Sequence, residues 1–369
     1  MSLKMTGKFN LRDTLRRLGP GLITGAADDD PSGIATYSQA GAQFGFSMLW
    51  TMVFTLPLMV AIQLVSARIG YVTGHGLVAN IKARFPRPVL FAVVGLLLLA
   101  NTLNLADDIA AMAEALRLLV GGSAHRAPAL PGGHDVLLTV VAVFGTTISP
   151  YLFFWQAAQE VEDINASAGR PHSAPEVRHH LRRIKLDTLI GMTFSNLIAF
   201  FIILSTAVTL HAAGVHDIET SAQAAEALRP LAGELTFLLF SLGIIGTGLL
   251  AVPVLAGSAA YAVAEAAGWQ GSLSLRLRKG QGRGFYGVIA AATLGGVVLC
   301  FTSMDPVKEL FWSAVLNGVI AVPIMAIMML LASRRDTMGE HVIGRRLRWR
   351  GWLATTVMTA TVIAMLGTA

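Results

Sequence analysis

The chain has 369 residues, of which 54% are hydrophobic and 14% are charged, and its mean hydropathy is +0.62. This composition excludes an ordinary soluble domain and indicates a protein that crosses a membrane several times. Lys and Arg exceed Asp and Glu to give a formal net charge of +6, which we attribute to loops that set orientation rather than to a nucleic-acid site. A single cysteine, Cys300, excludes an intramolecular disulfide framework.

The first hydrophobic segment, 18–43, is interrupted at its middle by GAADDDPSG, residues 25–33. Three consecutive aspartates stand where a spanning helix should be most apolar. A charge there costs at least ~2.5 kcal/mol, so such residues usually face a cavity. Pro31 and Gly33 favour two half-helices with unpaired carbonyls between them. Unwound backbone beside a carboxylate is how transporters build a cation site. The alternative is a short half-helix that the aspartates cap at a wet surface.

Apolar windows of about 20 residues predict an all-α protein with about nine membrane spans in one transmembrane domain, 1–369. The predicted spans are 18–43, 48–70, 89–120, 136–156, 189–210, 235–267, 285–301, 307–332 and 352–366. A short amphipathic piece, 76–85, is expected to lie at the membrane interface. The remaining expected segments are an N-terminal arm at 1–17, an external loop at 121–135 and a polar loop at 159–185. Glu160, Glu162 and Asp163 are expected to form a solvated helix end.

Basic residues follow the alternation that this span count requires. The segments rich in Lys and Arg are 1–17, 68–87, 170–185, 276–283 and 334–350, and the four intervening connections hold few. We therefore expect the N-terminus in the cytoplasm and the C-terminus outside, in the inner (plasma) membrane of a bacterium. The segment after the basic N-terminus lacks a small-residue cleavage site, which favours a first span over a signal peptide.

Polar residues also interrupt later spans. Asn101, Asn104 and Asp108 share one helical face of the third span, where they either link helices through hydrogen bonds or line an ion route. The fourth span contains GTTISPY, residues 145–151, which indicates a second broken helix or a simple proline kink. Paired discontinuous helices are the best sequence pointer to a transporter site.

If the two breaks face each other, a cation between them would meet only oxygen atoms. The candidate ligands are the Asp30 carboxylate, the freed carbonyls near Ala27 and Thr146, and the hydroxyls of Thr147 and Ser149, with Asp108 of the third span as a more distant candidate. Oxygen ligands suit Mg²⁺, Ca²⁺ or Mn²⁺, and the lack of sulfur and imidazole argues against selection of softer metals. The histidines lie almost wholly in loops, without HExxH spacing.

Three stretches of the chain carry a family likeness. They are DPSGIATYSQAGAQFGFSMLW at 30–50, QLVSARIGYVTG at 63–74 and GTTISPYLFFWQ at 145–156. These stretches resemble the Nramp-type family of divalent metal transporters. The resemblance implies a LeuT-like fold, in which two inverted repeats place a site at broken helices. Transferred residue by residue, it implies a metal-binding carboxylate at Asp30 and carbonyl ligands at Ala27 and Thr146.

Departures from the family pattern bear on the choice of ion. The family's asparagine, methionine and histidine ligands correspond to Gly33, Ser149 and Tyr151. Loss of a thioether should relax or reverse a preference for soft transition metals. The chain is therefore similar to a divergent, magnesium-associated branch of the family. There Asp28 and Asp29 would help to hold a partly hydrated ion through water.

The resemblance also implies about eleven spans, ten of them in two repeats. In this chain the helix that resembles the family's sixth span follows directly after the third. The family's fourth and fifth spans are therefore expected to be missing between 121 and 136. Their loss leaves one repeat incomplete, which favours either a homo-oligomer that covers the exposed faces or a shortened form that does not transport.

We therefore predict a secondary transporter of Mg²⁺ or Mn²⁺ that works by alternating access around Asp30, with proton coupling as an open question. The ion is the substrate, and no resident cofactor, nucleic-acid partner or enzyme activity is expected. One alternative is an amino-acid or sodium symporter of the same fold, although clustered acids would repel a substrate carboxylate. Another is an intramembrane aspartyl hydrolase that uses Asp30 with Asp107 or Asp108.

Overall fold

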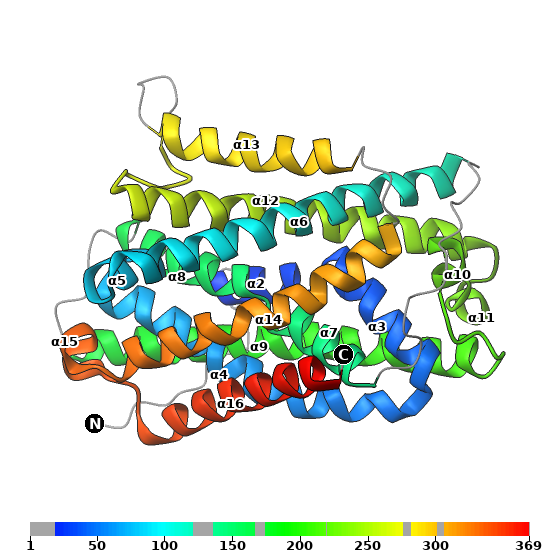
Figure 1. The fold of residues 1–369 in the computed structure, drawn as a ribbon, viewed down its shortest axis with the longest axis horizontal. Coiled ribbons are helices and arrows are strands. Elements are labelled where there is room, and N and C mark those ends of the chain that lie inside the picture. The colour runs from blue at the N-terminus through cyan, green and yellow to red at the C-terminus, as the bar shows by residue number, and fades with distance from the viewer. Residues whose placement is uncertain are drawn as a thin grey trace, which may run out of the picture.

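The computed structural model describes residues 19–120, 136–166, 174–218, 220–275, 282–300 and 306–368, which form helices and no strand (Figure 1). The helices are α2 (Pro20–Asp28), α3 (Pro31–Phe44), η1 (Gly45–Met48), α4 (Leu49–Thr73), α5 (Leu77–Arg84), α6 (Arg87–Val120), α7 (Val136–Thr147), α8 (Pro150–Ala166), α9 (Ala174–Thr206), η2 (Ala207–His211), α10 (Ser221–Glu226), α11 (Arg229–Ala232), η3 (Gly233–Leu235), α12 (Thr236–Ala267), α13 (Arg283–Leu299), α14 (Pro306–Ser333), α15 (Arg335–Met338), η5 (Gly339–His341) and α16 (Arg345–Thr368). The predicted arm 1–17 and external loop 121–135 lie outside the described residues.

Each predicted span coincides with one helix or with a broken pair. The first corresponds to α2 and α3 and the fourth to α7 and α8, so both expected breaks are present. By length and composition, six helical stretches of the described chain are apolar enough to cross a membrane. The all-helical membrane fold is therefore confirmed, and the count of nine spans stays a prediction.

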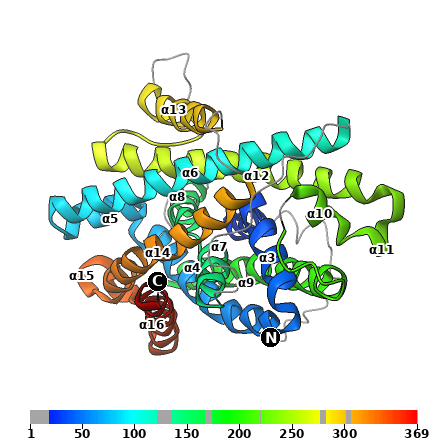
Figure 2. The same ribbon diagram turned by 45° about the vertical axis from the view of Figure 1, so that its right-hand side comes forward.

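The long helices run roughly along the longest axis of the molecule, with α5 and α15 at one end and α10 and α11 at the other (Figure 1). The helix α13 lies at the edge of the bundle, against α6 and α12 (Figure 2). The predicted amphipathic helix is α5, which buries Leu77, Val78 and Ile81 and exposes Lys82 and Arg84. Its position at a membrane interface stays a prediction.

Glycines allow α2 to lie directly on α9. A Cβ atom on Gly25 would fall 2.4 Å from the backbone of Gly191, and one on Gly191 would fall 2.2 Å from the Gly21 carbonyl oxygen. Small residues let the backbones of membrane helices approach this closely. The contact fixes the half-helix that leads into the first break.

Two amides of α6 hold it to its neighbours. The Asn101 side chain donates to the Leu255 carbonyl (2.9 Å) and to the Ser258 hydroxyl (2.7 Å), both on α12. The Asn104 amide exchanges two hydrogen bonds of 3.1 Å with Asn317 of α14. Of the two roles expected for these asparagines, the structure shows the one in which they link helices.

The expectation of a polar loop at 159–185 is wrong. The helix α8 continues to Ala166 and α9 begins at Ala174. Arg183 of α9 pairs with Asp163 of α8, so charged residues here hold two helix ends together. Glu160 is only 1% exposed, which contradicts its expected solvation, because its side chain lies on the packed face of α8.

The α2–α9 contact predicts that Gly25→Ala destabilises the protein. The added methyl group has no room, and overpacking of this kind typically costs roughly 1–3 kcal/mol. Gly246→Ala in α12 is the matched control, because among the described residues no atom beyond its own stretch of helix lies within 4 Å of its Cβ position. Thermal unfolding in detergent should show a lower midpoint for Gly25→Ala alone. Equal midpoints for the two variants would contradict the close crossing.

Candidate metal centre

Asp30 builds the break in the first helix. Because α2 ends at Asp28 and α3 begins at Pro31, Asp30 is the N-cap residue, with φ −70° and ψ 170°. Its Oδ1 accepts hydrogen bonds from the Gly33 amide (2.8 Å) and the Ser32 hydroxyl (2.9 Å). Aspartate is a favoured N-cap and proline a favoured first helical residue, which explains why DPSG starts a new helix. The second oxygen, Oδ2, remains for contacts with other helices.

A serine and a proline build the second break. The helix α7 ends at Thr147 and α8 begins at Pro150. The Ser149 hydroxyl donates to the carbonyl oxygens of Gly145 (3.0 Å) and Thr146 (2.7 Å). The Thr146 Oγ1 is buried and has no hydrogen-bond partner. The carbonyl oxygen and the hydroxyl group of Thr146 therefore both lie at the end of α7.

The two breaks meet at a tyrosine. The Tyr151 hydroxyl, in the first turn of α8, donates to the Ala27 carbonyl (2.7 Å) and to Asp30 Oδ2 (3.2 Å). A Cβ atom on Gly33 would lie 3.2 Å from Thr146 Oγ1, so the start of α3 also touches the end of α7. The structure thus brings together the backbone of α2, the carboxylate of Asp30 and the break of α7 and α8 in the buried core. Their role as metal ligands stays a prediction.

The other two aspartates of the motif face a different helix. The Ser195 hydroxyl of α9 donates to Asp28 Oδ2 (2.5 Å) and to Asp29 Oδ1 (3.2 Å). Their remaining oxygens, Asp28 Oδ1 and Asp29 Oδ2, are buried without a hydrogen-bond partner. All three aspartates are at most 3% exposed, so the alternative of a half-helix capped at a wet surface is wrong.

Two further predicted candidates lie beside the breaks. The Thr147 hydroxyl donates to the Val143 carbonyl (2.6 Å) and lies 2.9 Å from the Tyr37 hydroxyl, which ties it to α7 and α3. Asp108 of α6 is fully buried, and neither of its carboxylate oxygens has a hydrogen-bond partner. Its carboxyl group is near enough to interact electrostatically with Asp30.

The alternative of an aspartyl hydrolase needs two carboxyl groups in contact. Such a pair shares one proton between two carboxyl groups in contact. Asp30 bonds with Ser32, Gly33 and Tyr151, and its pairing with Asp107 or Asp108 stays a prediction.

Sequence reasoning missed the residues of α9 that hold α2. Besides Ser195, Asp187 accepts hydrogen bonds from the Gly19 amide (3.0 Å) and the Gly21 amide (2.7 Å) at the start of α2. Asp187, Gly191 and Ser195 are spaced four residues apart, so they share one face of α9. This spacing of small and polar residues inside a predicted span was the sequence signal that could have indicated a helix contact here.

A helical membrane bundle whose two interrupted helices meet at a buried carboxylate has the architecture of secondary transporters with discontinuous helices. The family model described as "Natural resistance-associated macrophage protein-like" (Nramp) matches residues 21–127 and 122–368. The chain belongs to the Nramp family.

Curated relatives and solved structures agree with this assignment. The chain is 23% identical over 422 residues to the divalent metal cation transporter MntH of Pectobacterium carotovorum, with 99% of this chain and 97% of the relative covered. It is 26% identical over 292 residues to MntH of Yersinia pestis, covering 64% and 69%. A histidine-to-alanine mutant of the Eremococcus coleocola manganese transporter has the same fold, with a TM-score of 0.73, 16% identity, and coverage of 98% of this chain and 88% of that one.

The alignment with the Pectobacterium relative also bears on the expected loss of two spans. It extends over 422 positions, whereas this chain has 369 residues, so at least 53 positions of the relative have no counterpart here. Two spans of about 20 residues with their loops need roughly this length. The 15 residues between α6 and α7 are too few for even one span.

The Ser195 contacts predict that Ser195→Ala lowers stability, because it leaves two buried carboxylates without their donor. Loss of a hydrogen bond to a charged group costs about 1.5–3 kcal/mol. Ser205→Ala is the control, since within the described parts of the chain the Ser205 hydroxyl bonds only to the Phe201 carbonyl of its own helix. Thermal unfolding should separate the two variants. A Ser205→Ala midpoint as low as that of Ser195→Ala would show that the carboxylate contact adds nothing.

Proposed function

We propose that this protein is a secondary transporter that moves a divalent cation by alternating access around Asp30. The observation that carries the proposal is the meeting of the two helix breaks at the Tyr151 hydroxyl, which contacts Ala27 of α2 and Asp30 of α3. Membership of the Nramp family supports it. So do the names of the relatives, which describe transporters of divalent metal cations and of manganese.

The proposed substrate is Mg²⁺ or Mn²⁺, because the atoms around the breaks are oxygens. They come from the Asp30 carboxylate, the Ala27 and Thr146 carbonyls, and the hydroxyls of Thr146, Ser149 and Tyr151. Hard divalent cations favour such ligands, whereas softer metals favour thioether and imidazole groups. The Gly33 position offers no side chain, and its amide already donates to Asp30.

In this proposal, the position of the Tyr151 hydroxyl determines how an ion is coordinated. Its hydroxyl lies between Ala27 O and Asp30 Oδ2, the two atoms expected to bind the ion. An ion bound there has two possible relations to the hydroxyl. It displaces the hydroxyl, or it keeps a coordinated water molecule that forms a hydrogen bond with the hydroxyl. The second arrangement suits Mg²⁺, which dehydrates reluctantly and usually keeps several waters.

We assign Asp28 and Asp29 an electrostatic role. Their described contacts are with Ser195 on α9, and in this proposal they act on the ion from outside its first set of ligands. Negative charges a few ångströms apart in a low-dielectric interior repel one another strongly. A doubly charged cation beside Asp30 relieves that repulsion, and this favours divalent over monovalent ions.

We also propose that the protein lies in a bacterial inner membrane with its N-terminus in the cytoplasm. The positive-inside rule supports this orientation, because α5 and α15, which carry basic residues of two predicted cytoplasmic segments, lie at the same end of the bundle (Figure 1). We further propose that the protein forms a homo-oligomer, which covers the faces exposed by the incomplete repeat.

We also propose that transport of the divalent cation is coupled to protons. In the liposome assay described below, a pH-sensitive dye enclosed in the vesicles measures this coupling directly.

The central test is uptake of Mg²⁺ and Mn²⁺ into liposomes. Asp30→Asn keeps the shape of the side chain but removes its charge, so uptake should fall at least about tenfold, equivalent to ~1.4 kcal/mol. Asp336→Asn removes a charge from the exposed helix α15 and should transport normally. Undiminished uptake by Asp30→Asn would end the assignment. No flux from folded parent protein would favour the shortened, non-transporting alternative.

A second variant tests the choice of ion. Ser149→Met introduces the thioether of the family pattern, and we expect it to shift relative affinity toward Mn²⁺ and Cd²⁺ and away from Mg²⁺. Ser149→Ala is the control, because it removes the hydroxyl without adding sulfur. Calorimetric competition among the three ions measures the preference. Unchanged relative affinities would place Ser149 outside the ligand set.

A further inference from the structure

The segment between α9 and α12 covers one end of the bundle (Figure 1). It contains α10 and α11, and glycines in the left-handed region flank it: Gly214 with φ 77° and Gly233 with φ 55°. Apart from the adjacent residues, no atom of the described chain lies within 4 Å of a Cβ position on either glycine, so the surroundings leave room for backbone rotation at both ends. We call residues 215–218 and 220–232 the lid.

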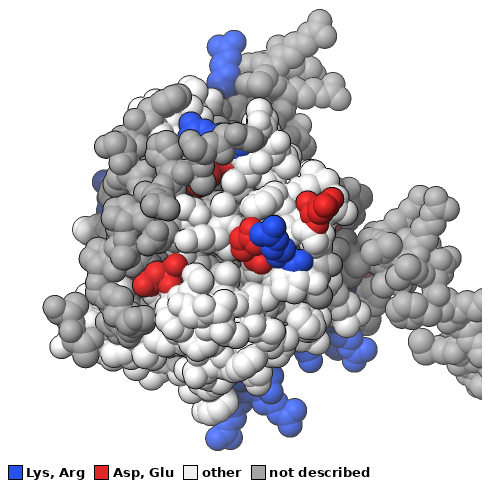
Figure 3. Space-filling view, turned by 90° about the vertical axis from the view of Figure 1, so that its right-hand side faces the viewer, with Lys and Arg blue, Asp and Glu red and all other residues white. Residues whose placement is uncertain are grey.

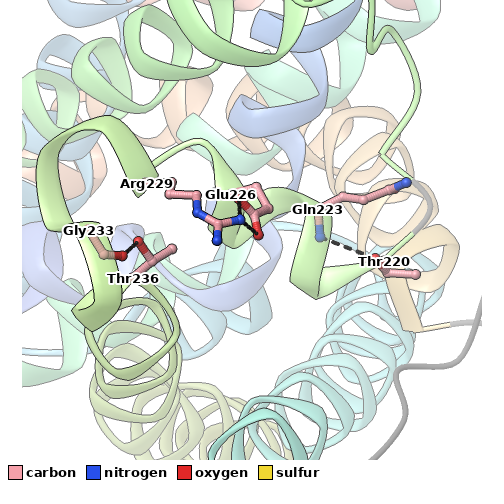
Figure 4. A network of polar contacts seen from close by, with 6 residues as sticks. All are labelled: Thr220, Gln223, Glu226, Arg229, Gly233 and Thr236. Atoms are coloured by element: carbon pink, nitrogen blue, oxygen red, sulfur yellow. Dashed lines mark hydrogen bonds and ion pairs between the residues drawn. The ribbon is translucent and has the colours of Figure 1, made fainter.

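The lid is held in shape by its own polar contacts (Figure 4). The Thr220 hydroxyl caps α10 by accepting from the Gln223 amide (3.1 Å), and Arg229 pairs with Glu226 at 2.8 Å. At its end the Thr236 hydroxyl donates to the Gly233 carbonyl (2.7 Å). Charged groups are few on the described surface at this end (Figure 3). Internal bonds with a glycine on each side favour movement of the lid as one piece.

Two glutamines of α3 fasten the lid to the helix that begins at Asp30. They are the glutamines of the QAGAQ motif, Gln39 and Gln43, one helical turn apart and at most 8% exposed. Both side-chain amides donate to Asp217 Oδ1, at 3.3 and 3.1 Å, and Gln39 also accepts from the Ile218 amide (3.0 Å). The lid therefore receives its buried polar contacts from α3.

Further contacts reinforce the same junction. The imidazole of His211 contacts the Ala42 carbonyl at 2.8 Å, and that of His216 contacts it at 3.3 Å. Ile218 packs in a small apolar cluster with Ala42 and Leu210. Loop and helix thus meet over a continuous surface beside the two glutamines.

A mainly apolar cavity lies beneath this junction. Its walls include Pro31 and Ala35 of α3, Ile218 and Ala224 of the lid, and Phe240 of α12. Pro31 follows Asp30 directly, so the cavity extends from the underside of the lid to the residue next to the proposed ligand. The lid and the outer half of α3 form opposite walls of one hollow.

We propose that the lid closes the route from this end of the molecule to Asp30, and that Gln39 and Gln43 are the positioning residues that latch it. The proposal rests on the proposed function, because the route matters only if an ion uses it. Opening separates both glutamines from Asp217 and Ile218 while the lid turns about Gly214 and Gly233. The cavity lined by Ala35 is then accessible to water.

Thiol accessibility tests the latch without any transport measurement. In a Cys300→Ser background, Ala35→Cys places one thiol in the cavity, and a water-soluble maleimide measures its exposure in nanodiscs. Asp217→Ala removes the acceptor shared by both glutamines and should raise the labelling rate at least about tenfold, the factor expected for the loss of even one hydrogen bond to a charged group. Asp217→Asn retains an oxygen acceptor and should label at nearly the parent rate.

Glu226→Gln is the matched control, because it breaks an ion pair within the lid and leaves the α3 contacts intact. Its labelling rate should equal that of the parent. Gln43→Ala provides a second test if Asp217→Ala does not fold, and melting temperatures verify each variant. Equal labelling of the parent and both latch variants, or an equal increase in Glu226→Gln, would overturn the latch. Because no ion is involved, this failure is distinct from normal uptake by Asp30→Asn, which would overturn the function.

Discussion

The contact between Tyr151 and the Asp30 break is the interaction on which the structure depends. Interrupting a helix inside a membrane leaves backbone groups unpaired, and each costs several kcal/mol unless the protein supplies a partner. Here the Asp30 carboxylate accepts a hydrogen bond from the Gly33 amide at the start of α3, and the Ser149 hydroxyl donates one to the Thr146 carbonyl at the end of α7. The Tyr151 hydroxyl contacts both the Ala27 carbonyl and the Asp30 carboxylate. The same groups that make the breaks tolerable also supply the oxygen atoms of the proposed metal site, so in that proposal structural and functional requirements coincide at these residues.

The helix α9 provides the support that keeps this arrangement in place. Its contacts with α2 occur at the start through Asp187, in the middle through Gly191 and at the break through Ser195. A half-helix of nine residues is too short to be stable alone, because isolated helices below about 12–15 residues are marginal. Packing against α9 along its whole length therefore determines where Ala27 and Asp28 lie.

Much of this could be predicted from the sequence, because proline and aspartate in apolar segments have strong local consequences. DPSG and TTISP located both breaks, and a link between helices was one of the two roles expected of Asn101 and Asn104. The direction of Asp28 and Asp29 could not be predicted, since the turn at the break rotates them away from Asp30 by an amount that only the packing on α9 fixes. The burial of Glu160 was missed because a cluster of charged residues is typical of a solvated helix end, whereas here the charged residues occupy packed helix ends.

The helix α3 connects the two regions that carry function in these proposals. Its first turn is capped by Asp30, and its later turns present Gln39 and Gln43 to the lid. A helix of 14 residues spans about 21 Å and behaves as a nearly rigid rod. A cation that draws Asp30 toward the second break would tilt that rod and move both glutamines relative to Asp217. One short helix can thus link occupancy of the site to closure of the entrance, without a chain of intermediate contacts.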